Sequence, residues 1–210
     1  MKLVPKWLET GWLALTRPIS NACIRAGIRP NTITTVGLLL ILVSAVCYGL
    51  GHVRWGGFFL LISGWTDLVD GQVARGGGME TKFGAFYDST LDRVGDGLTY
   101  IGIGSFFLLY PGDLAWRQGV VVLCMVGVMA SLLVSYARAR AEGLGLDGKV
   151  GIAQRTERIL GLGLPSLVMG VGERGIVLSS IVLILTLLSL ITVGQRFVWV
   201  YQQTEGAKAP

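Results

Sequence analysis

The sequence has little charge, few cysteines and a single histidine. Only 15% of its 210 residues are charged, whereas 52% are hydrophobic and the mean hydropathy is +0.62, which is too apolar for a soluble fold. Cys23, Cys47 and Cys124 form an odd set without metal-ligand spacing, so no disulfide framework or cysteine-based metal site is expected. The N-terminal residues lack the short apolar core and small-residue cleavage site of a removable signal peptide.

The sequence is instead rich in long apolar segments. A helix needs roughly 18 to 20 mostly apolar residues to cross about 30 Å of lipid. Six segments are predicted to do so: residues 32–50, 55–75, 82–109, 116–141, 157–172 and 175–200. The 31 glycines fit such helices, because small residues let helix backbones approach closely.

The two ends of the chain differ from these spans. Apolar and basic residues alternate over residues 3–29, a pattern typical of an interfacial amphipathic helix: Trp7, Leu8, Trp12, Leu13 and Ile19 with Lys6, Arg17, Arg25 and Arg29. Pro30 then signals a helix start, with Asn31 or Thr32 as its cap. The predicted fold is an all-α integral membrane protein with six transmembrane helices and an N-terminal interfacial amphipathic helix. We expect one domain over residues 1–201, its first 30 residues juxtamembrane, and a polar tail over 202–210.

Basic residues are distributed unevenly between the two predicted membrane faces. Six spans place both termini on one side, and that side holds all but three of the 18 lysines and arginines: Arg54, Arg117 and Arg174. The positive-inside rule therefore predicts cytoplasmic termini in a cell (inner) membrane. The net charge of +5 is interpreted as a topology signal and an anion-binding surface facing lipids and small anions, and no nucleic-acid partner is expected.

Two pairs of aspartates stand inside the predicted spans. Asp67 and Asp70 are three residues apart, and Asp88 and Asp92 are four apart, so each pair shares one helical face. The break at Gly76-Gly77-Gly78 lets the two helices run antiparallel and the pairs face each other. Carboxylates in a membrane are costly and mark functional sites, and carboxylate oxygens suit hard cations such as Mg²⁺ or Mn²⁺. Four of them could hold two ions that clamp a phosphate ester.

Glycine and arginine accompany these acids. Gly71 and Gly84 lack a Cβ, so a bulky ligand can approach the backbone beside the metals. Arg75 could bind a phosphate through two N–H groups. The alternative is that the acids only form ion pairs with nearby basic residues: Arg75, Lys82 and Arg93. Asp96 continues the spacing one turn deeper, and we expect it to have a structural or supporting role.

The full pattern is D-x2-D-G-x2-A-R-x8-G-x3-D-x3-D, from Asp67 to Asp92. It resembles the signature of the CDP-alcohol phosphotransferases at every specified position. The resemblance implies a six-helix homodimeric enzyme that transfers a phosphatidyl group from a CDP-lipid, usually CDP-diacylglycerol, to an alcohol and releases CMP. It implies that all four aspartates hold metal and that Asp92 is the catalytic base. It also implies that the CDP-lipid is bound by Pro30, Asn31, Thr32, Gly71, Ala74, Arg75, Thr81 and Gly84.

The residues around the acids favour direct attack by the acceptor alcohol. No cysteine or histidine stands beside the aspartates as an obvious nucleophile, and the single histidine, His52, lies on the opposite predicted membrane face. We therefore expect metal ions to neutralise the diphosphate while Asp92 takes the proton of the acceptor hydroxyl.

A second group of basic residues precedes and follows the loop between the fourth and fifth spans. Arginine is the preferred side chain for phosphate, so an acceptor that carries a phosphate would explain them: Arg138, Arg140, Arg155 and Arg158, with Arg196 as a further candidate. The alternative is a general positive-inside bias toward anionic lipid headgroups, with Arg196 as a snorkelling interface residue.

The segments 135–142 and 150–158 are similar to the phosphatidylinositol-phosphate synthase branch, bacterial or archaeal, in which the acceptor is inositol 1-phosphate. Arg138 stands where lysine is common in that branch, and Gln154 where an acid is common. Glycerol 3-phosphate, the acceptor of a phosphatidylglycerophosphate synthase, stays open. A divalent-cation transporter is the alternative from another class, but the acids gather at one face without a polar relay across the bilayer.

Overall fold

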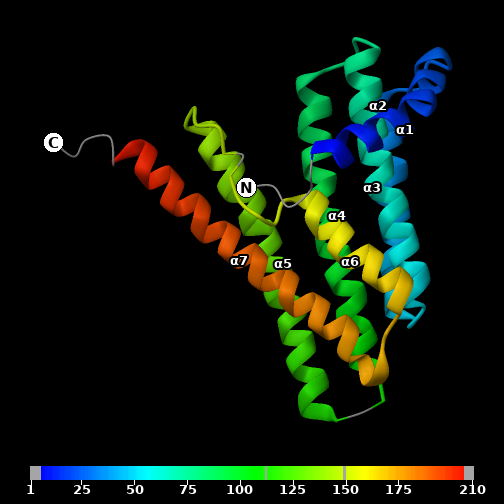
Figure 1. Cartoon of the computed structure of the whole chain (residues 1–210), viewed down its shortest axis with the longest axis vertical. Helices are drawn as coiled ribbons and strands as arrows, with labels where there is room; N and C mark the ends of the chain where they lie inside the picture. The colour runs from blue at the N-terminus through cyan, green and yellow to red at the C-terminus, as the bar shows by residue number, and fades with distance from the viewer. Residues whose placement is uncertain (1–5, 112, 149, 206–210) are drawn as a thin grey trace.

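The protein is built from α-helices (Figure 1). The computed structural model describes residues 6–111, 113–148 and 150–205. Its elements are α1 Lys6–Arg25, α2 Pro30–Gly49, α3 Val53–Gly76, α4 Lys82–Leu109, α5 Leu114–Gly143, α6 Arg155–Met169, the short 3-10 helix η1 Glu173–Gly175, and α7 Ile176–Thr204. Helices α2 to α7 fall within a few residues of the six predicted spans, so the all-α prediction is confirmed.

Three of these helices are long and apolar enough to cross a membrane: Pro30–Gly49, Ala115–Gly143 and Ile176–Thr204. Helices α3 and α4 carry the acidic pairs within their apolar sequence, and α6 has only 15 residues. The protein is therefore a membrane protein by composition and length, and the count of six crossings stays a prediction.

Two predicted boundaries were wrong. Neither Asn31 nor Thr32 caps α2: Arg29 occupies the N-cap position without a side-chain cap bond, and Pro30 is the first helical residue, where its missing N–H leaves no intrahelical bond unmade. The last helix does not end near residue 200, the predicted end of the sixth span, because α7 continues to Thr204. Residues 206–210 lie outside the described part of the chain.

Helix α1 turns polar side chains toward α3. Thr16 and Ser20 are buried, while Leu15 and Ile19 are exposed. The Ser20 hydroxyl donates to Gln72 Oε1 at 2.8 Å, and Gln72 Nε2 donates to Thr16 Oγ1 at 2.5 Å. This arrangement fits an interfacial helix whose outer side meets lipid. The structure describes the backbone but not the side chains of four predicted apolar residues of this helix: Trp7, Leu8, Trp12 and Leu13.

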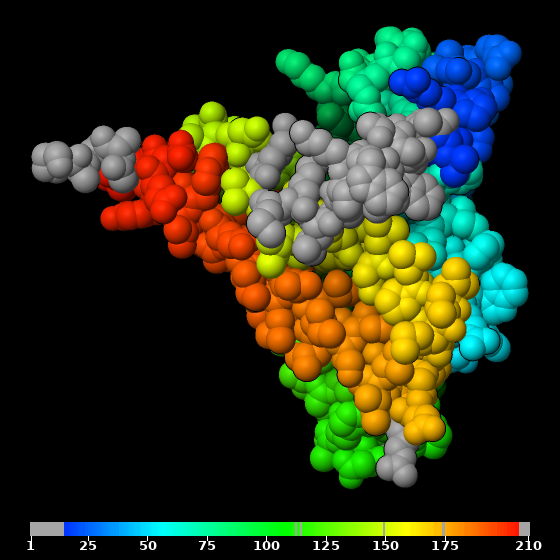
Figure 2. All heavy atoms as spheres, viewed as in Figure 1, coloured from blue at the N-terminus to red at the C-terminus, as the bar shows by residue number. Residues whose placement is uncertain are grey.

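Close packing of the remaining helices depends on glycine. Helix α2 packs on α3 and α4, α6 packs on α3, and α7 packs on α5 and α6, so that α6 and α7 adjoin on the face in Figure 2. A Cβ at Gly102 would lie 2.3 Å from the Ala45 carbonyl oxygen, and one at Gly57 would lie 2.7 Å from the Gly163 carbonyl oxygen. These contacts hold α4 close to α2 and α3 close to α6. Because α3 also packs on α2, the two helices that carry the acidic side chains share α2 as a neighbour.

Candidate metal and anion site

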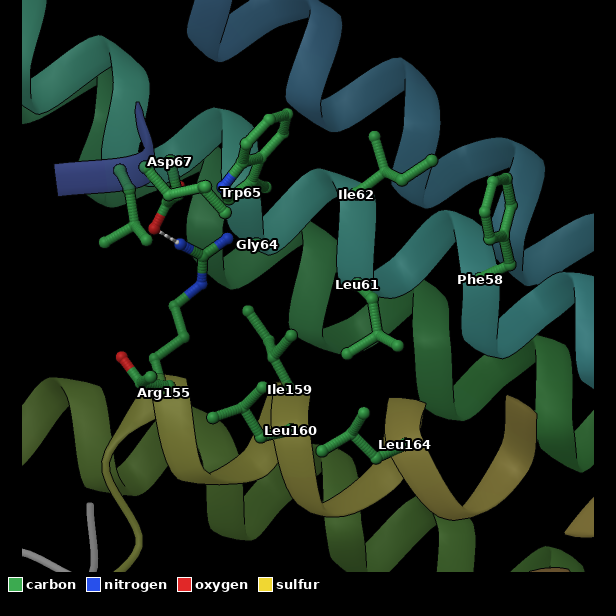
Figure 3. A pocket seen from close by; sticks show the side chains of 13 residues that line it. Phe58, Leu61, Ile62, Gly64, Trp65, Asp67, Arg155, Ile159, Leu160 and Leu164 are labelled. Atoms are coloured by element: carbon green, nitrogen blue, oxygen red, sulfur yellow. Dashed lines mark hydrogen bonds and ion pairs between the residues drawn. The ribbon is translucent and has the colours of Figure 1, made fainter. Parts of the chain in front are cut away.

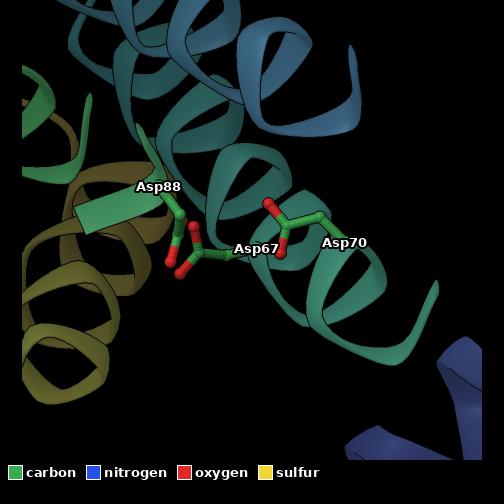
Figure 4. Close-up of side chains that lie close together, drawn as sticks. All are labelled: Asp67, Asp70 and Asp88. Atoms are coloured by element: carbon green, nitrogen blue, oxygen red, sulfur yellow. The ribbon is translucent and has the colours of Figure 1, made fainter. Parts of the chain in front are cut away.

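Three of the four predicted metal ligands converge between α3 and α4. Asp67 and Asp70 lie on α3 and Asp88 on α4, and one carboxylate oxygen of each lies within 4.8 Å of the others. Figure 4 shows Asp67 and Asp88 facing each other, with the Asp70 side chain directed toward them. The turn after α3, with Gly78 at φ 62°, reverses the chain so that α3 and α4 both pack on α2. The helical spacing of the acids therefore yields a real cluster.

The carboxylate environment fits a divalent cation. Asp88 Oδ1 is buried and has no hydrogen-bond partner within the described part of the chain. Asp70 is 6% exposed, and its Oδ2 accepts a 2.8 Å hydrogen bond from the Thr34 hydroxyl of α2. An oriented carboxylate and an unpartnered buried carboxylate oxygen are what a hard cation with oxygen ligands requires.

The fourth predicted ligand, Asp92, lies beside an arginine rather than within that cluster. Arg155, the first residue of α6, places its Nη1 2.9 Å from Asp92 Oδ1. The same Nη1 also forms an ion pair and hydrogen bond with Asp67 Oδ2. Arg155 thus contacts acids from both α3 and α4. The alternative prediction that the acids form ion pairs named only Arg75, Lys82 and Arg93 as partners. The sequence did not indicate that Arg155 would contact Asp67 and Asp92.

The residues predicted to bind the CDP-lipid lie where α2 and α4 begin and α3 ends. A Cβ at Gly84 would lie 3.0 Å from Thr81 Oγ1 and 3.3 Å from Asn31 Oδ1. Thr81 caps α4 by accepting from the Gly84 N–H. A Cβ at Gly71 would lie 3.2 Å from both Nη atoms of Arg75. The remaining three belong to the same helix ends: Pro30, Thr32 and Ala74.

Four of the five predicted acceptor arginines line one cavity of about 210 Å³. Its lining also includes two of the acids, and the full set is Asp67, Asp92, Arg93, Val134, Ser135, Arg138, Gln154, Arg155, Thr156, Arg158 and Arg196. Arg140 is exposed and does not line it. With Arg93, the cavity combines five guanidinium groups with two carboxylates, so an anion inside it would lie beside the acidic cluster.

Most arginines of this cavity are fixed by partners of their own. Arg158 is 5% exposed and forms an ion pair with Asp96, which agrees with the supporting role predicted for that acid. Arg196 is 4% exposed; its Nε donates to the Val150 carbonyl at 2.7 Å. It therefore joins α7 to the α5–α6 loop, and the snorkelling alternative was wrong. Arg138 pairs with Glu142 at 2.8 Å on the exposed side of α5.

A second, larger cavity of about 400 Å³ runs between α3 and α6. Its walls are mainly apolar, with Phe58, Leu61 and Ile62 from α3 facing Ile159 and Leu160 from α6 (Figure 3). Asp67 and Arg155, joined by the dashed line in Figure 3, close one end of it. Asp67, Arg155 and Thr156 line both cavities. An apolar space and an arginine-lined space thus meet at the acidic cluster.

Sequence reasoning missed Thr34, which orients Asp70, and Gln154 and Thr156, which line the arginine cavity. A signal for Thr34 existed, because hydroxyl residues recur in the otherwise apolar segment 32–50 and must find partners there. The two loop-side residues gave no periodic signal, because they follow a glycine-rich segment without regular spacing.

Comparison with known proteins gives consistent results. The family profile described as CDP-alcohol phosphatidyltransferase matches residues 28–204. The chain is 38% identical over 191 residues to the archaetidylinositol phosphate synthase of Methanothermobacter thermautotrophicus, with 90% of this chain and 91% of that protein covered. It is 31% identical over 205 residues to the phosphatidylinositol phosphate synthase of Cutibacterium acnes, with coverage of 94% and 97%.

Solved structures of the Mycobacterium tuberculosis phosphatidylinositol phosphate synthase share the fold. The structure with CDP-DAG bound has a TM-score of 0.78 and 28% identity, covering 94% of this chain and 98% of that one. The structure in complex with manganese and citrate has a TM-score of 0.78 and 30% identity, covering 93% and 92%.

Proposed function

The chain belongs to the CDP-alcohol phosphatidyltransferase family and is a transferase, and from this premise we propose that it makes a phosphatidylinositol-phosphate-type lipid. It transfers the phosphatidyl group of CDP-diacylglycerol, or of a related CDP-lipid, to inositol 1-phosphate and releases CMP. The relatives from Cutibacterium acnes and Methanothermobacter thermautotrophicus carry the names of such synthases, and the structure of a phosphatidylinositol phosphate synthase has been solved with CDP-DAG bound.

One observation carries this proposal: the two cavities share residues at the acidic cluster. Asp67, Arg155 and Thr156 line both the apolar space between α3 and α6 and the arginine-lined space. A lipid-linked diphosphate needs apolar walls for its chains and cations for its phosphates. A phosphorylated acceptor needs basic side chains within reach of the same phosphates. The protein offers both environments side by side.

The reaction assigns a separate role to each part of the site. Asp67, Asp70, Asp88 and Asp92 would hold one or two Mg²⁺ or Mn²⁺ ions, which neutralise the diphosphate when bound. Asp92 accepts the proton of the acceptor hydroxyl as its oxygen forms a bond to the β-phosphorus. The bond from that phosphorus to the CMP oxygen breaks, and CMP leaves with the electron pair. The residues at the ends of α2, α3 and α4 hold the cytidine diphosphate part.

The arginine cavity favours an acceptor with a phosphate of its own. Arg158 is almost fully buried, and its Nε has no hydrogen-bond partner among the described residues. A buried guanidinium with a free donor is ready to bind an anion, whereas serine or free inositol would bring no such charge. Glycerol 3-phosphate has the same phosphate and is the second candidate, favoured by this observation alone and not by the named relatives.

We also propose how the protein is oriented in the membrane and that it forms a dimer. Both termini and the active site face the cytoplasm of a cell membrane, because the basic residues concentrate on that side. The enzyme acts as a homodimer, as the family resemblance implies.

The test is an acceptor panel with radiolabelled CDP-diacylglycerol and purified protein. Inositol 1-phosphate, glycerol 3-phosphate, inositol and serine are supplied separately, with Mg²⁺, with Mn²⁺ and with a chelator. We expect CMP release and a labelled lipid with inositol 1-phosphate only, and no product with the chelator. Conversion of glycerol 3-phosphate alone would establish the second candidate. Conversion of serine alone would contradict the role given to the arginine cavity.

A further inference from the structure

Arg155 contacts the acidic cluster and lines both cavities, which no other arginine of the site does. Its Nη1 meets Asp92 Oδ1 at 2.9 Å and also pairs with Asp67. Its side chain is 18% exposed, and its Nε is buried without a hydrogen-bond partner in the described part of the chain. Arg158, Arg196 and Arg138 are instead bound to partners outside the acidic cluster.

We propose that Arg155 couples metal binding to acceptor binding by exchanging the Asp67 and Asp92 carboxylates for the acceptor's phosphate. The inference rests on the proposed function for the identity of that acceptor. The competition for the carboxylates rests only on the observed ion pairs.

The coupling follows from charge and geometry. A divalent ion on Asp67 needs the carboxylate oxygens that Arg155 contacts, and it places positive charge beside the guanidinium, so ion and arginine compete. An anion in the arginine cavity attracts the same guanidinium away from the acids, toward a space that it already lines. Each ligand therefore favours the arrangement that the other needs. Such coupling is reciprocal: the acceptor must tighten metal binding by the same factor by which the metal tightens acceptor binding.

A direct experiment measures Mn²⁺ binding to purified protein by isothermal titration calorimetry, without donor lipid. The proteins are wild type, R155Q and R138Q, each with and without inositol 1-phosphate. Arg138 is the matched control, because it lines the arginine cavity but pairs with Glu142 rather than with a metal-ligating acid.

We expect R155Q to bind Mn²⁺ roughly tenfold more tightly than wild type, a factor within the usual range for coupled sites. Inositol 1-phosphate should tighten Mn²⁺ binding to wild type and to R138Q, but should change it little in R155Q. If Arg155 only supported the fold, R155Q would bind both Mn²⁺ and inositol 1-phosphate more weakly than wild type. Unchanged or weaker Mn²⁺ binding by folded R155Q would overturn the proposal.

A second variant covers a loss of folding. If R155Q fails to fold, R155M, which keeps an unbranched side chain but carries no charge, must still bind Mn²⁺ more tightly than wild type. The same preparations are assayed for product from inositol 1-phosphate. If wild type makes product from inositol 1-phosphate but the Arg155 variants bind Mn²⁺ no more tightly than wild type, the coupling is wrong and the proposed function stands. The shift without product overturns only the proposed acceptor and leaves the competition for the carboxylates supported.

Discussion

The acidic and the basic halves of the site are built in opposite ways. On α3 and α4, carboxylates gather against one another, and Asp88 keeps a buried oxygen without a partner among the described residues. On α5, α6 and α7, arginines gather as well, but Arg158 and Arg196 are each bound to a partner of their own. Three carboxylates this close together, with only Asp67 paired to a basic side chain within the described ranges, favour a ligand of opposite charge. The arginines with partners of their own are held in place as the lining of the cavity. Arg155 belongs to this lining and also contacts Asp67 and Asp92.

The largest effect on the reaction rate should come from substituting the acids, and the two variants Asp92→Asn and Asp88→Asn should distinguish the proposed base from the metal-binding cluster. Asp92 lies outside the three-carboxylate cluster, so Asp92→Asn should lower the rate by about 10²–10⁴, the usual loss when a general base is removed. Mn²⁺ binding should largely remain, because Asp67, Asp70 and Asp88 can still hold an ion without Asp92. Asp88→Asn, inside the cluster, should lose both activity and Mn²⁺ binding. The comparison uses CMP release and calorimetry on the same preparations. Equal loss of Mn²⁺ binding in both variants would contradict the separation.

A smaller loss is expected when the support of an acid is removed. Thr34→Val keeps the side-chain shape but removes the 2.8 Å hydrogen bond to Asp70. Loss of a group that orients a metal ligand typically costs about 10- to 100-fold in metal affinity. Thr35→Val is the matched control on the same helix, because the Thr35 hydroxyl contacts the Tyr87 hydroxyl at 2.9 Å and not an acid. Similar Mn²⁺ affinities for both variants would show that Asp70 needs no such support.

The acidic half should also be sensitive to helix spacing. A Cβ at Gly102 would lie 2.3 Å from the Ala45 carbonyl oxygen, whereas a Cβ at Gly97 meets nothing within 4 Å. Gly102→Ala should therefore lower the free energy of unfolding by about 1–3 kcal/mol through overpacking, and Gly97→Ala should not. Thermal unfolding in detergent measures both. An unaltered melting temperature for Gly102→Ala would mean that α2 and α4 can separate without cost.

The smallest effect on stability is expected at the exposed edge of the basic half. Arg138 and Glu142 form an ion pair with side chains 41% and 46% exposed, and such pairs contribute at most about 1 kcal/mol. Arg138→Gln should leave the melting temperature nearly unchanged and raise the KM for inositol 1-phosphate more than that for the CDP-lipid. A KM change confined to the lipid would place Arg138 outside the acceptor cavity.

The acidic half was predictable because its pattern is local. Helical spacing alone places Asp67 and Asp70 on one face and Asp88 on a face opposite them, and the three glycines at 76–78 supply the turn. The helices themselves followed from apolar length. The number of membrane crossings did not, because acids in α3 and α4 and the shortness of α6 obscure that signal.

The basic half could be predicted only as a group. Charge asymmetry and the preference of arginine for phosphate indicated an anion site, and four of the five arginines do share a cavity. Their partners lie on other helices: Asp96 holds Arg158, and the Val150 carbonyl holds Arg196. No spacing in one sequence encodes such contacts, so the position of Arg155 between Asp67 and Asp92 required the fold.

The most direct test of the account is anomalous diffraction from crystals of the purified protein grown with Mn²⁺. The account predicts manganese peaks between α3 and α4, with oxygens of Asp67, Asp70 and Asp88 as ligands at every occupied site. Crystals that contain Mn²⁺ elsewhere, with these three carboxylates bound only to basic side chains, would contradict it.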